Sequence, residues 1–141
     1  MPVCILLAEV RRLDLIGYVV GGVVVAVAAV QILPLLRARR MRGQPAPDLT
    51  GVAADAQRQL PRLLVYFWSP TCGMCRGMTP VIDRLARERP DIVKVNVQET
   101  AQLARRFGVM ATPALALLRD GRIERVALGA RSEAQIRALL A

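Results

Sequence analysis

The hydrophobic positions of this chain form one long uncharged block followed by several shorter patterned runs. The block extends from Leu15 to Leu36 without an acidic or basic residue. A helix of this length, rising 1.5 Å per residue, would be about 33 Å long and would match the hydrocarbon core of a bilayer. The pattern therefore predicts one N-terminal transmembrane helix over residues 15–36.

A cleaved secretory signal is the alternative interpretation of this block. Arg11 and Arg12 would form its basic region, and Ala26 and Ala28 would frame a small-x-small cleavage site. The apolar run continues beyond that site to Leu36, and this favours a retained span.

The shorter runs predict an α/β domain. Residues 63–68 are apolar throughout, as in a buried central strand, and residues 92–97 alternate as in a second strand. Residues 73–89 repeat apolar side chains every three to four positions, which predicts a helix that faces the core. A final helix begins after Ser132, which can form a capping box with Gln135. The other expected elements are an edge strand at 48–50, helices at 52–60 and 100–107, and a hairpin of strands at 114–118 and 123–128 joined by an Asp-Gly turn.

These runs divide the chain into four segments. Glycine and prolines at residues 43–47 exclude a continuing helix and predict an extended linker. The predicted organisation is an N-terminal segment at 1–14, the transmembrane helix at 15–36, a basic and proline-rich linker at 37–47 and a folded domain at 48–141.

The arginines that flank the span bear on its orientation. Two precede it, and four follow it at positions 37, 39, 40 and 42. The positive-inside rule then predicts a single-pass protein of the plasma (inner) membrane with its folded domain in the cytoplasm. Signal cleavage, or an additional effect of the N-terminal residues, would reverse this and give a periplasmic or other extracytoplasmic domain.

Two further features of the N-terminal region concern its contacts. Small residues at 17, 21, 22 and 26 lie on one helical stripe, which permits a weak homodimer through the transmembrane helix. Cys4 is isolated and lacks a lipid-attachment context, so it is interpreted as an unpaired thiol.

The net charge of +9 does not indicate a nucleic-acid-binding protein. All 20 basic residues except Lys94 are arginines, and they are spread over the predicted helix faces and the membrane flank. Only 4% of the residues are aromatic, so there is no platform for stacking bases. Nucleic acid is therefore not an expected partner.

The chemistry of the chain centres on Cys72-Gly73-Met74-Cys75. This pair lies where the 63–68 strand passes into the next helix, a context typical of a redox motif. A helix N-terminus carries about half a positive charge, so it should favour the Cys72 thiolate and lower its pKa below the ~8.5 of free cysteine. Cys75 lies one turn further along and should stay protonated for longer. It would then attack a mixed disulfide at Cys72 and release the substrate.

The alternatives for the cysteine pair are half of a zinc site, a static disulfide or two unrelated core cysteines. Zinc usually takes four Cys or His ligands. The chain has no His, and its third cysteine is the distant Cys4, so no metal site is expected.

Several motifs resemble the thioredoxin family over about residues 48–141. They are Phe67-Trp68 before the cysteine pair, Pro80 in the following helix, Asn96, Thr112-Pro113 before the hairpin, and Gly121 in its turn. The resemblance implies a thioredoxin fold, with a central mixed β-sheet flanked by helices, and a cis bond between Thr112 and Pro113. It also implies a redox-active Cys72–Cys75 disulfide without a further cofactor. Thr112, Pro113 and Trp68 would bind the substrate chain.

The chain departs from the thioredoxin pattern near the second cysteine. Gly73-Met74 replaces the usual Gly-Pro between the cysteines, and Thr71 replaces a tryptophan. Tyr66 stands where thioredoxins bury an aspartate, and Lys94 matches the lysine that pairs with it. We hypothesise that Tyr66 or a water relays the proton of Cys75, with Lys94 nearby. The alternative is a plain core tyrosine and a lysine that extends to solvent.

The sequence therefore predicts a membrane-tethered thiol–disulfide oxidoreductase, a protein disulfide reductase in the broad sense. Its expected partners are protein thiols and disulfides, an electron donor or acceptor, and the lipid bilayer. One alternative is a soft-metal carrier that binds Cu(I) through Cys72, Cys75 and Met78. The other is a tethered interaction module whose cysteines are not catalytic.

Overall fold

The computed structural model describes residues 2–141, with side chains described from residue 15 onward. Contacts divide it into two units, Met1–Leu33 and Pro34–Ala141. The interpretations placed on the side chains of Cys4, Arg11 and Arg12 lie outside the described residues.

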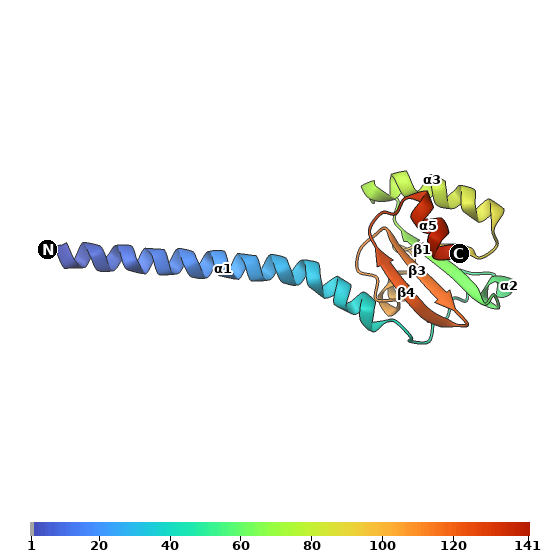
Figure 1. Ribbon diagram of the computed structural model, residues 1–141, viewed down its shortest axis with the longest axis horizontal. Coiled ribbons are helices and arrows are strands. Elements are labelled where there is room, and N and C mark those ends of the chain that lie inside the picture. The colour runs from blue at the N-terminus through green and yellow to red at the C-terminus, as the bar shows by residue number, and fades with distance from the viewer. Residues whose placement is uncertain (1) are drawn as a thin grey trace. The chain divides into compact units, whose positions relative to one another are not determined.

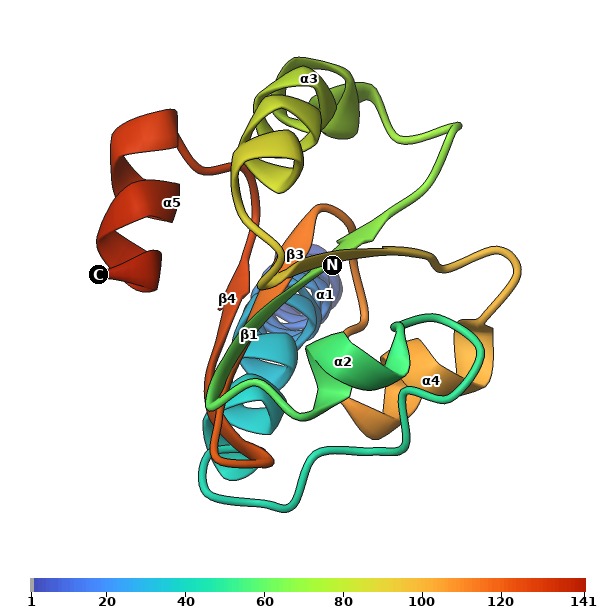
Figure 2. The same cartoon turned by 90° about the vertical axis from the view of Figure 1, so that its right-hand side faces the viewer.

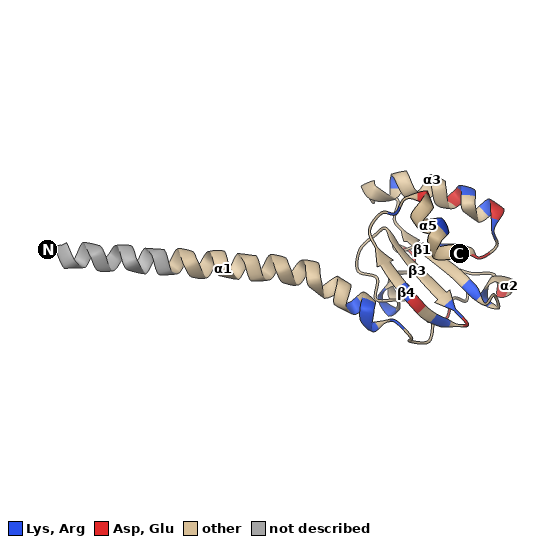
Figure 3. Ribbon diagram, viewed as in Figure 1, with Lys and Arg blue, Asp and Glu red and all other residues tan. Residues whose placement is uncertain are grey.

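The first unit consists of most of helix α1 (Pro2–Arg40). Within the described side chains, one helical stretch, Leu15–Arg40, is long and apolar enough to cross a membrane, with a mean hydropathy of 2.5 in its most apolar part. In Figure 3 this stretch carries no charged residue before the basic residues at its C-terminal end. The helix agrees with the predicted span in length and composition, and it continues past Leu36 to Arg40.

The second unit is built on a four-stranded mixed sheet (Figure 1). Its spatial order is β2-β1-β3-β4, with β1 parallel to β2 and antiparallel to β3, and β3 antiparallel to β4. The strands are β1 (Arg62–Trp68), β2 (Ile92–Asn96), β3 (Ala114–Arg119) and β4 (Arg122–Leu128). The predicted mixed α/β architecture is confirmed, including the central place of the apolar strand β1.

Helices cover both faces of this sheet, α3 and α5 on one face and α2 and α4 on the other (Figure 2). Their bounds are α2 (Asp55–Arg58), α3 (Gly73–Glu88), α4 (Ala101–Arg106) and α5 (Glu133–Leu140). The capping box predicted for α5 is present, with Ser132 and Gln135 exchanging side-chain and backbone hydrogen bonds.

Strand β1 divides its side chains between two cores. Leu63, Val65 and Phe67 pack on the α4 side, where Phe67 lies 5.2 Å from the ring of Phe107. Leu64 and Tyr66 point to the α3 side. Because side chains alternate along a strand, one continuous apolar run supplies both faces and fixes β1 at the centre of the sheet.

The predicted Asp-Gly hairpin joins β3 and β4 in two residues. Asp120 and Gly121 both have positive φ, 50° and 71°, as a tight turn between right-twisted strands requires. Asp-Gly supplies this conformation at low cost because glycine lacks a Cβ and aspartate tolerates the left-handed region.

The segment before the domain pairs with the edge of β4. Gly43 N donates to Ile123 O at 2.7 Å, Ile123 N donates to Gln44 O at 2.9 Å, and Ala46 N donates to Gly121 O at 2.8 Å. The sequence predicted a spacer here. Glycine and proline do stop the helix, but the linker is then held by backbone hydrogen bonds.

The short strand predicted at residues 48–50 is wrong. Asp48 Oδ1 accepts hydrogen bonds from the backbone N and the hydroxyl of Thr50, at 2.9 and 2.6 Å. These bonds lower the pKa of Asp48 and form a local turn. An Asp side chain that bonds the backbone two residues ahead competes with strand pairing in this way.

Met41, at the start of the linker, packs against Gly108 in the loop before β3. Gly108 has a φ of +70°, and a Cβ there would lie 2.6 Å from Met41 Cγ. The close approach and the backbone conformation both require glycine at this position.

We predict that Gly108→Ala destabilises the domain more than Gly51→Ala does. Both substitutions put a side chain at positive φ, which costs about 1–2 kcal/mol, but a Cβ at Gly51 meets nothing within 4 Å. Urea unfolding of the full chain in detergent, followed by fluorescence of Trp68, measures the difference. Met41→Ala should lower the free energy of unfolding by less in the Gly108→Ala background than in the wild type. Equal losses of unfolding free energy in Gly108→Ala and Gly51→Ala would contradict the contact between Met41 and Gly108.

Candidate active site

A tight turn carries the chain from β1 into α3. Cys72 N donates to Ser69 O at 3.1 Å, with Pro70 at the second turn position, where its fixed φ is favourable. Ser69 is buried and its hydroxyl lies 2.8 Å from that of Thr71. The turn brings the first cysteine to the start of the helix and holds it there.

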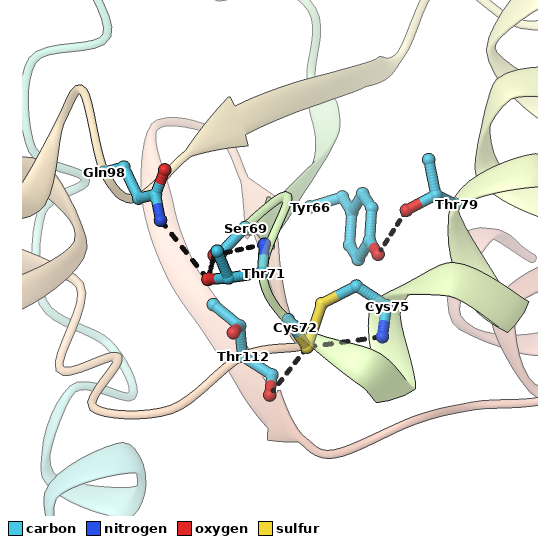
Figure 4. The surroundings of a disulfide bond; sticks show 8 residues. All are labelled: Tyr66, Ser69, Thr71, Cys72, Cys75, Thr79, Gln98 and Thr112. Carbon is cyan, nitrogen blue, oxygen red and sulfur yellow. Dashed lines mark hydrogen bonds between the residues drawn. A yellow bond between two sulfur atoms is a disulfide. The ribbon is translucent and has the colours of Figure 1, made fainter.

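Cys72 and Cys75 form a disulfide across the first turn of α3, with their Cα atoms 5.3 Å apart (Figure 4). Cys72 is the N-cap residue, and its Sγ accepts a hydrogen bond from Cys75 N at 3.2 Å. The first turn holds no acidic side chain. Cys72 is partly exposed, whereas Cys75 is 2% exposed.

The Thr112–Pro113 peptide is cis and lies beside Cys72. Cys72 Sγ is 3.4 Å from Thr112 O. Pro113 is fully buried, and its carbonyl accepts a hydrogen bond from Gly129 N at 2.9 Å. The structure thus brings together four of the predicted site residues, Cys72, Cys75, Thr112 and Pro113.

Trp68 ends strand β1 on the α3 side of the sheet. The ammonium of Lys94 lies 5.0 Å from the centre of its ring. The same ammonium is 2.5 Å from Asp83 Oδ1 on α3. Lys94 is therefore anchored between a carboxylate and an aromatic face, an arrangement favourable for a cation.

Tyr66 is buried next to Lys94 in the strand register, but its hydroxyl pairs with Thr79. The two oxygens are 3.0 Å apart, and Figure 4 shows the phenol pointing toward Thr79. Burial raises the pKa of Tyr66, the bond to Thr79 opposes this, and the nearby Asp83 carboxylate raises it further. Tyr66 is thus protonated at neutral pH. No hydrogen bond among the described residues joins it directly to Lys94.

Comparison with known proteins agrees with this geometry. The thioredoxin family model matches residues 52–141, more than half of the chain. The chain belongs to the thioredoxin family. A thioredoxin of Bacillus subtilis is 35% identical over 81 residues, which are 55% of this chain and 78% of the relative. Thioredoxin 1 of Synechococcus elongatus is 38% identical over 71 residues, which are 48% of this chain and 66% of the relative.

Solved structures support the same assignment. A single-site mutant of a thioredoxin from Halobacterium salinarum matches with a TM-score of 0.56 and 26% identity, over 62% of this chain and 83% of that one. Mitochondrial thioredoxin 3 from Saccharomyces cerevisiae, in its oxidised form, matches with a TM-score of 0.51 and 27% identity, over 61% and 83%. The predicted thioredoxin fold is confirmed. Family membership also supports thiol–disulfide oxidoreductase activity on protein thiols and disulfides.

Met78, which the sequence offered as a third ligand for Cu(I), belongs to the thioredoxin core. It is 3% exposed and packs with Ile82 and Leu85 in the core on the α3 side of the sheet. Among the residues with described side chains, no three His, Cys, Asp or Glu residues come together as metal ligands. The burial of Met78 gives the carrier interpretation no support.

Three polar residues of this site were not found from the sequence: Ser69, Thr79 and Asp83. Ser-Pro after a strand is a turn signal that could have identified Ser69. Thr79 and Asp83 follow Cys75 at intervals of four residues, so the three share one stripe of α3. This spacing is visible in the sequence. The partners of Thr79 and Asp83 lie on β1 and β2, and those contacts depend on tertiary packing.

We predict that Tyr66 makes the stability of this thioredoxin domain fall at alkaline pH. Its folded pKa lies above the ~10 of an unfolded tyrosine. The contribution of Tyr66 to the free energy of unfolding is therefore complete below about pH 10. It is lost as the pH rises through the pKa of Tyr66 in the folded state.

Urea unfolding of the oxidised full chain between about pH 9 and pH 11 measures this loss. Tyr66→Phe should flatten the decline. Tyr18→Phe is the matched control, because Tyr18 is 80% exposed on α1. Identical pH profiles for the wild type and Tyr66→Phe would show that Tyr66 is not the group responsible.

Proposed function

We propose that this protein is a membrane-tethered thiol–disulfide oxidoreductase in which Cys72 is the nucleophile and Cys75 the resolving thiol. The observation that carries the proposal is the position of the Cys72–Cys75 disulfide. It lies at the first turn of α3, with Cys72 Sγ 3.4 Å from the carbonyl of the residue before the cis proline.

The reaction transfers two electrons between a dithiol and a disulfide. In the reducing direction, the Cys72 thiolate attacks one sulfur of a substrate disulfide, forms a mixed disulfide and releases the first substrate thiolate. The Cys75 thiolate then attacks Cys72 Sγ, and the second substrate thiolate leaves as the Cys72–Cys75 disulfide forms. The oxidising direction is the same sequence reversed.

The position of Cys72 favours its thiolate. Cys75 N donates toward Cys72 Sγ, and the free N–H groups at the start of α3 present partial positive charge. Hydrogen bonds to the charged form stabilise it. The partial exposure of Cys72 permits attack on a large substrate, and the burial of Cys75 reserves it for the intramolecular step.

Thr112, Pro113 and Trp68 are the proposed substrate contacts. The cis bond turns the backbone of Thr112 toward the disulfide, where an extended substrate chain can pair with it. Met74 and Met110 are 62% and 56% exposed. Methionine side chains adapt to varied apolar surfaces, so they suit substrates of different shape.

We further propose that the proton of Cys75 leaves along the polar stripe of α3. Cys75, Thr79 and Asp83 are spaced four residues apart, with the Tyr66 hydroxyl bonded to Thr79 and Lys94 bonded to Asp83. Tyr66 cannot act as a base because its proton is held at neutral pH. Its hydroxyl would hold Thr79 in place, and the Asp83 carboxylate bonded to Lys94 would accept the proton that Cys75 gives up.

The tether in this proposal is the apolar helix at Leu15–Arg40, which is compatible with a single membrane crossing. The arginine count still predicts a plasma-membrane protein with a cytoplasmic domain. Tethering would confine the enzyme to substrates that come near the bilayer.

We predict that Cys75→Ser traps substrate and Cys72→Ser does not. Without the resolving thiol, the mixed disulfide at Cys72 persists and runs as a larger species on a non-reducing gel. In an insulin-reduction assay with dithiothreitol, the wild type should be active and Cys72→Ser should have background activity. Wild-type activity at background level would support the interaction module instead.

We predict that Lys94→Met slows the resolving step several-fold while leaving the first attack by Cys72 nearly unchanged. Its loss leaves Asp83 without its partner and disturbs the proposed proton path. Stopped-flow fluorescence of Trp68 separates the two steps, and Asp83→Asn should have a similar effect.

Arg87→Met is the control for the Lys94 experiment, because Arg87 is an exposed cation in the last turn of α3. Unchanged rates of resolution in Lys94→Met and Asp83→Asn at every pH from about 6 to 8 would rule out the relay. Trapping by Cys75→Ser would still support the exchange mechanism in that case.

A further inference from the structure

A groove of about 660 Å³ lies in the second unit, apart from the disulfide. It is formed by the C-terminal end of α1, the outer edge of β4, and α5. Four arginines line it, Arg39 and Arg42 from the α1 end and Arg125 and Arg131 from β4 and the loop after it. Its apolar lining includes Leu35, Leu128 and Leu139.

The charge of this groove is not balanced by the protein. Its one acidic residue, Glu124, accepts a 3.1 Å hydrogen bond from Arg119 outside the groove. None of the four groove arginines forms an ion pair within the described part of the chain. By contrast, Arg84, Arg89 and Arg137 on the α3 and α5 side are all paired with carboxylates. The groove therefore favours an anionic occupant.

The free edge of β4 raises the alternative of an extended peptide. The linker already occupies the first part of that edge through its two hydrogen bonds with Ile123. Only residues 124–128 of this strand line the groove. This short edge provides few backbone partners, so the charge and the apolar lining favour a compact anion that carries a hydrocarbon part.

The chain connects this groove directly to the proposed span. Leu35 and Arg39 belong to helix α1, and Arg39 follows the predicted end of the span by only about 4.5 Å of helix. Arginines just beyond a transmembrane helix lie at the level of the lipid headgroups. Phosphate is a geometrically suitable partner for arginine, which binds it through two parallel N–H groups.

We propose that this groove binds the phosphate headgroup of an anionic phospholipid. The four arginines hold the phosphate, and Leu35, Leu128 and Leu139 contact the glycerol and the first carbons of the acyl chains. The inference rests on the proposed membrane tethering. The bound lipid would hold the redox domain at the bilayer surface, in addition to its covalent attachment through the linker.

The test uses the full chain in nanodiscs of phosphatidylglycerol and phosphatidylcholine in equal amounts, followed by native mass spectrometry of the lipids that remain bound. Phosphatidylglycerol should be enriched about tenfold over phosphatidylcholine. Arg125→Gln/Arg131→Gln should reduce this enrichment to about twofold or less. The control Arg87→Gln/Arg106→Gln removes the same charge from exposed positions outside the groove and should keep the enrichment.

Three results would overturn the proposal. Equal loss in both double variants would mean that only net charge matters. Loss of the enrichment with about 10 mM inorganic phosphate would indicate a site for free anions. Displacement of the lipid by a short polyglutamate peptide at similar concentration would indicate a peptide groove.

Two further measurements separate this proposal from the proposed function. Arg125→Gln/Arg131→Gln should keep full insulin-reduction activity, since both residues line the groove and neither forms a hydrogen bond with the disulfide. If activity and retention in carbonate-washed membranes are both intact without a preference for phosphatidylglycerol, only the lipid site is overturned. If the wild type leaves the membrane in carbonate, both the tether and the lipid site are overturned.

Discussion

The structure depends on one sulfur atom held between a helix start and a proline turn. Cys72 Sγ accepts the hydrogen bond of Cys75 N on one side and lies 3.4 Å from Thr112 O on the other. The amide favours a thiolate, and the carbonyl belongs to the residue that we propose as a substrate contact. The central strand β1 leads into the turn that places Cys72 at the start of α3, and the buried cis proline holds Thr112 beside it.

The same arrangement explains the polar groups that the domain keeps on one face. Tyr66, Thr79, Asp83 and Lys94 lie on the α3 side of the sheet, where an apolar core would otherwise continue. Each has a partner, and no buried side-chain nitrogen or oxygen among the described residues lacks one. A satisfied polar network costs little stability and provides fixed dipoles near the second thiol.

Much of the fold and of the redox centre could be predicted because their signals are local. The apolar run of β1, the spacing of α3, the Asp-Gly turn and the capping box at Ser132 are contained in a few neighbouring residues. The pairing of the linker with Ile123 could not be predicted, because it uses backbone groups that carry no side-chain signature. The prediction of an edge strand at 48–50 was wrong because the Asp48 side chain accepts a local hydrogen bond from the backbone of Thr50. Lys94 was recognised, but its partner Asp83 lies on another element.

The most direct test of this account is the reactivity of the two thiols in the reduced full chain carrying Cys4→Ser. Alkylation with iodoacetamide at neutral pH, followed site by site with mass spectrometry, compares each with free N-acetylcysteine. The account predicts that Cys72 reacts several-fold faster than the free thiol, and that the buried Cys75 reacts far more slowly. A Cys72 that reacts no faster than the free thiol would contradict it.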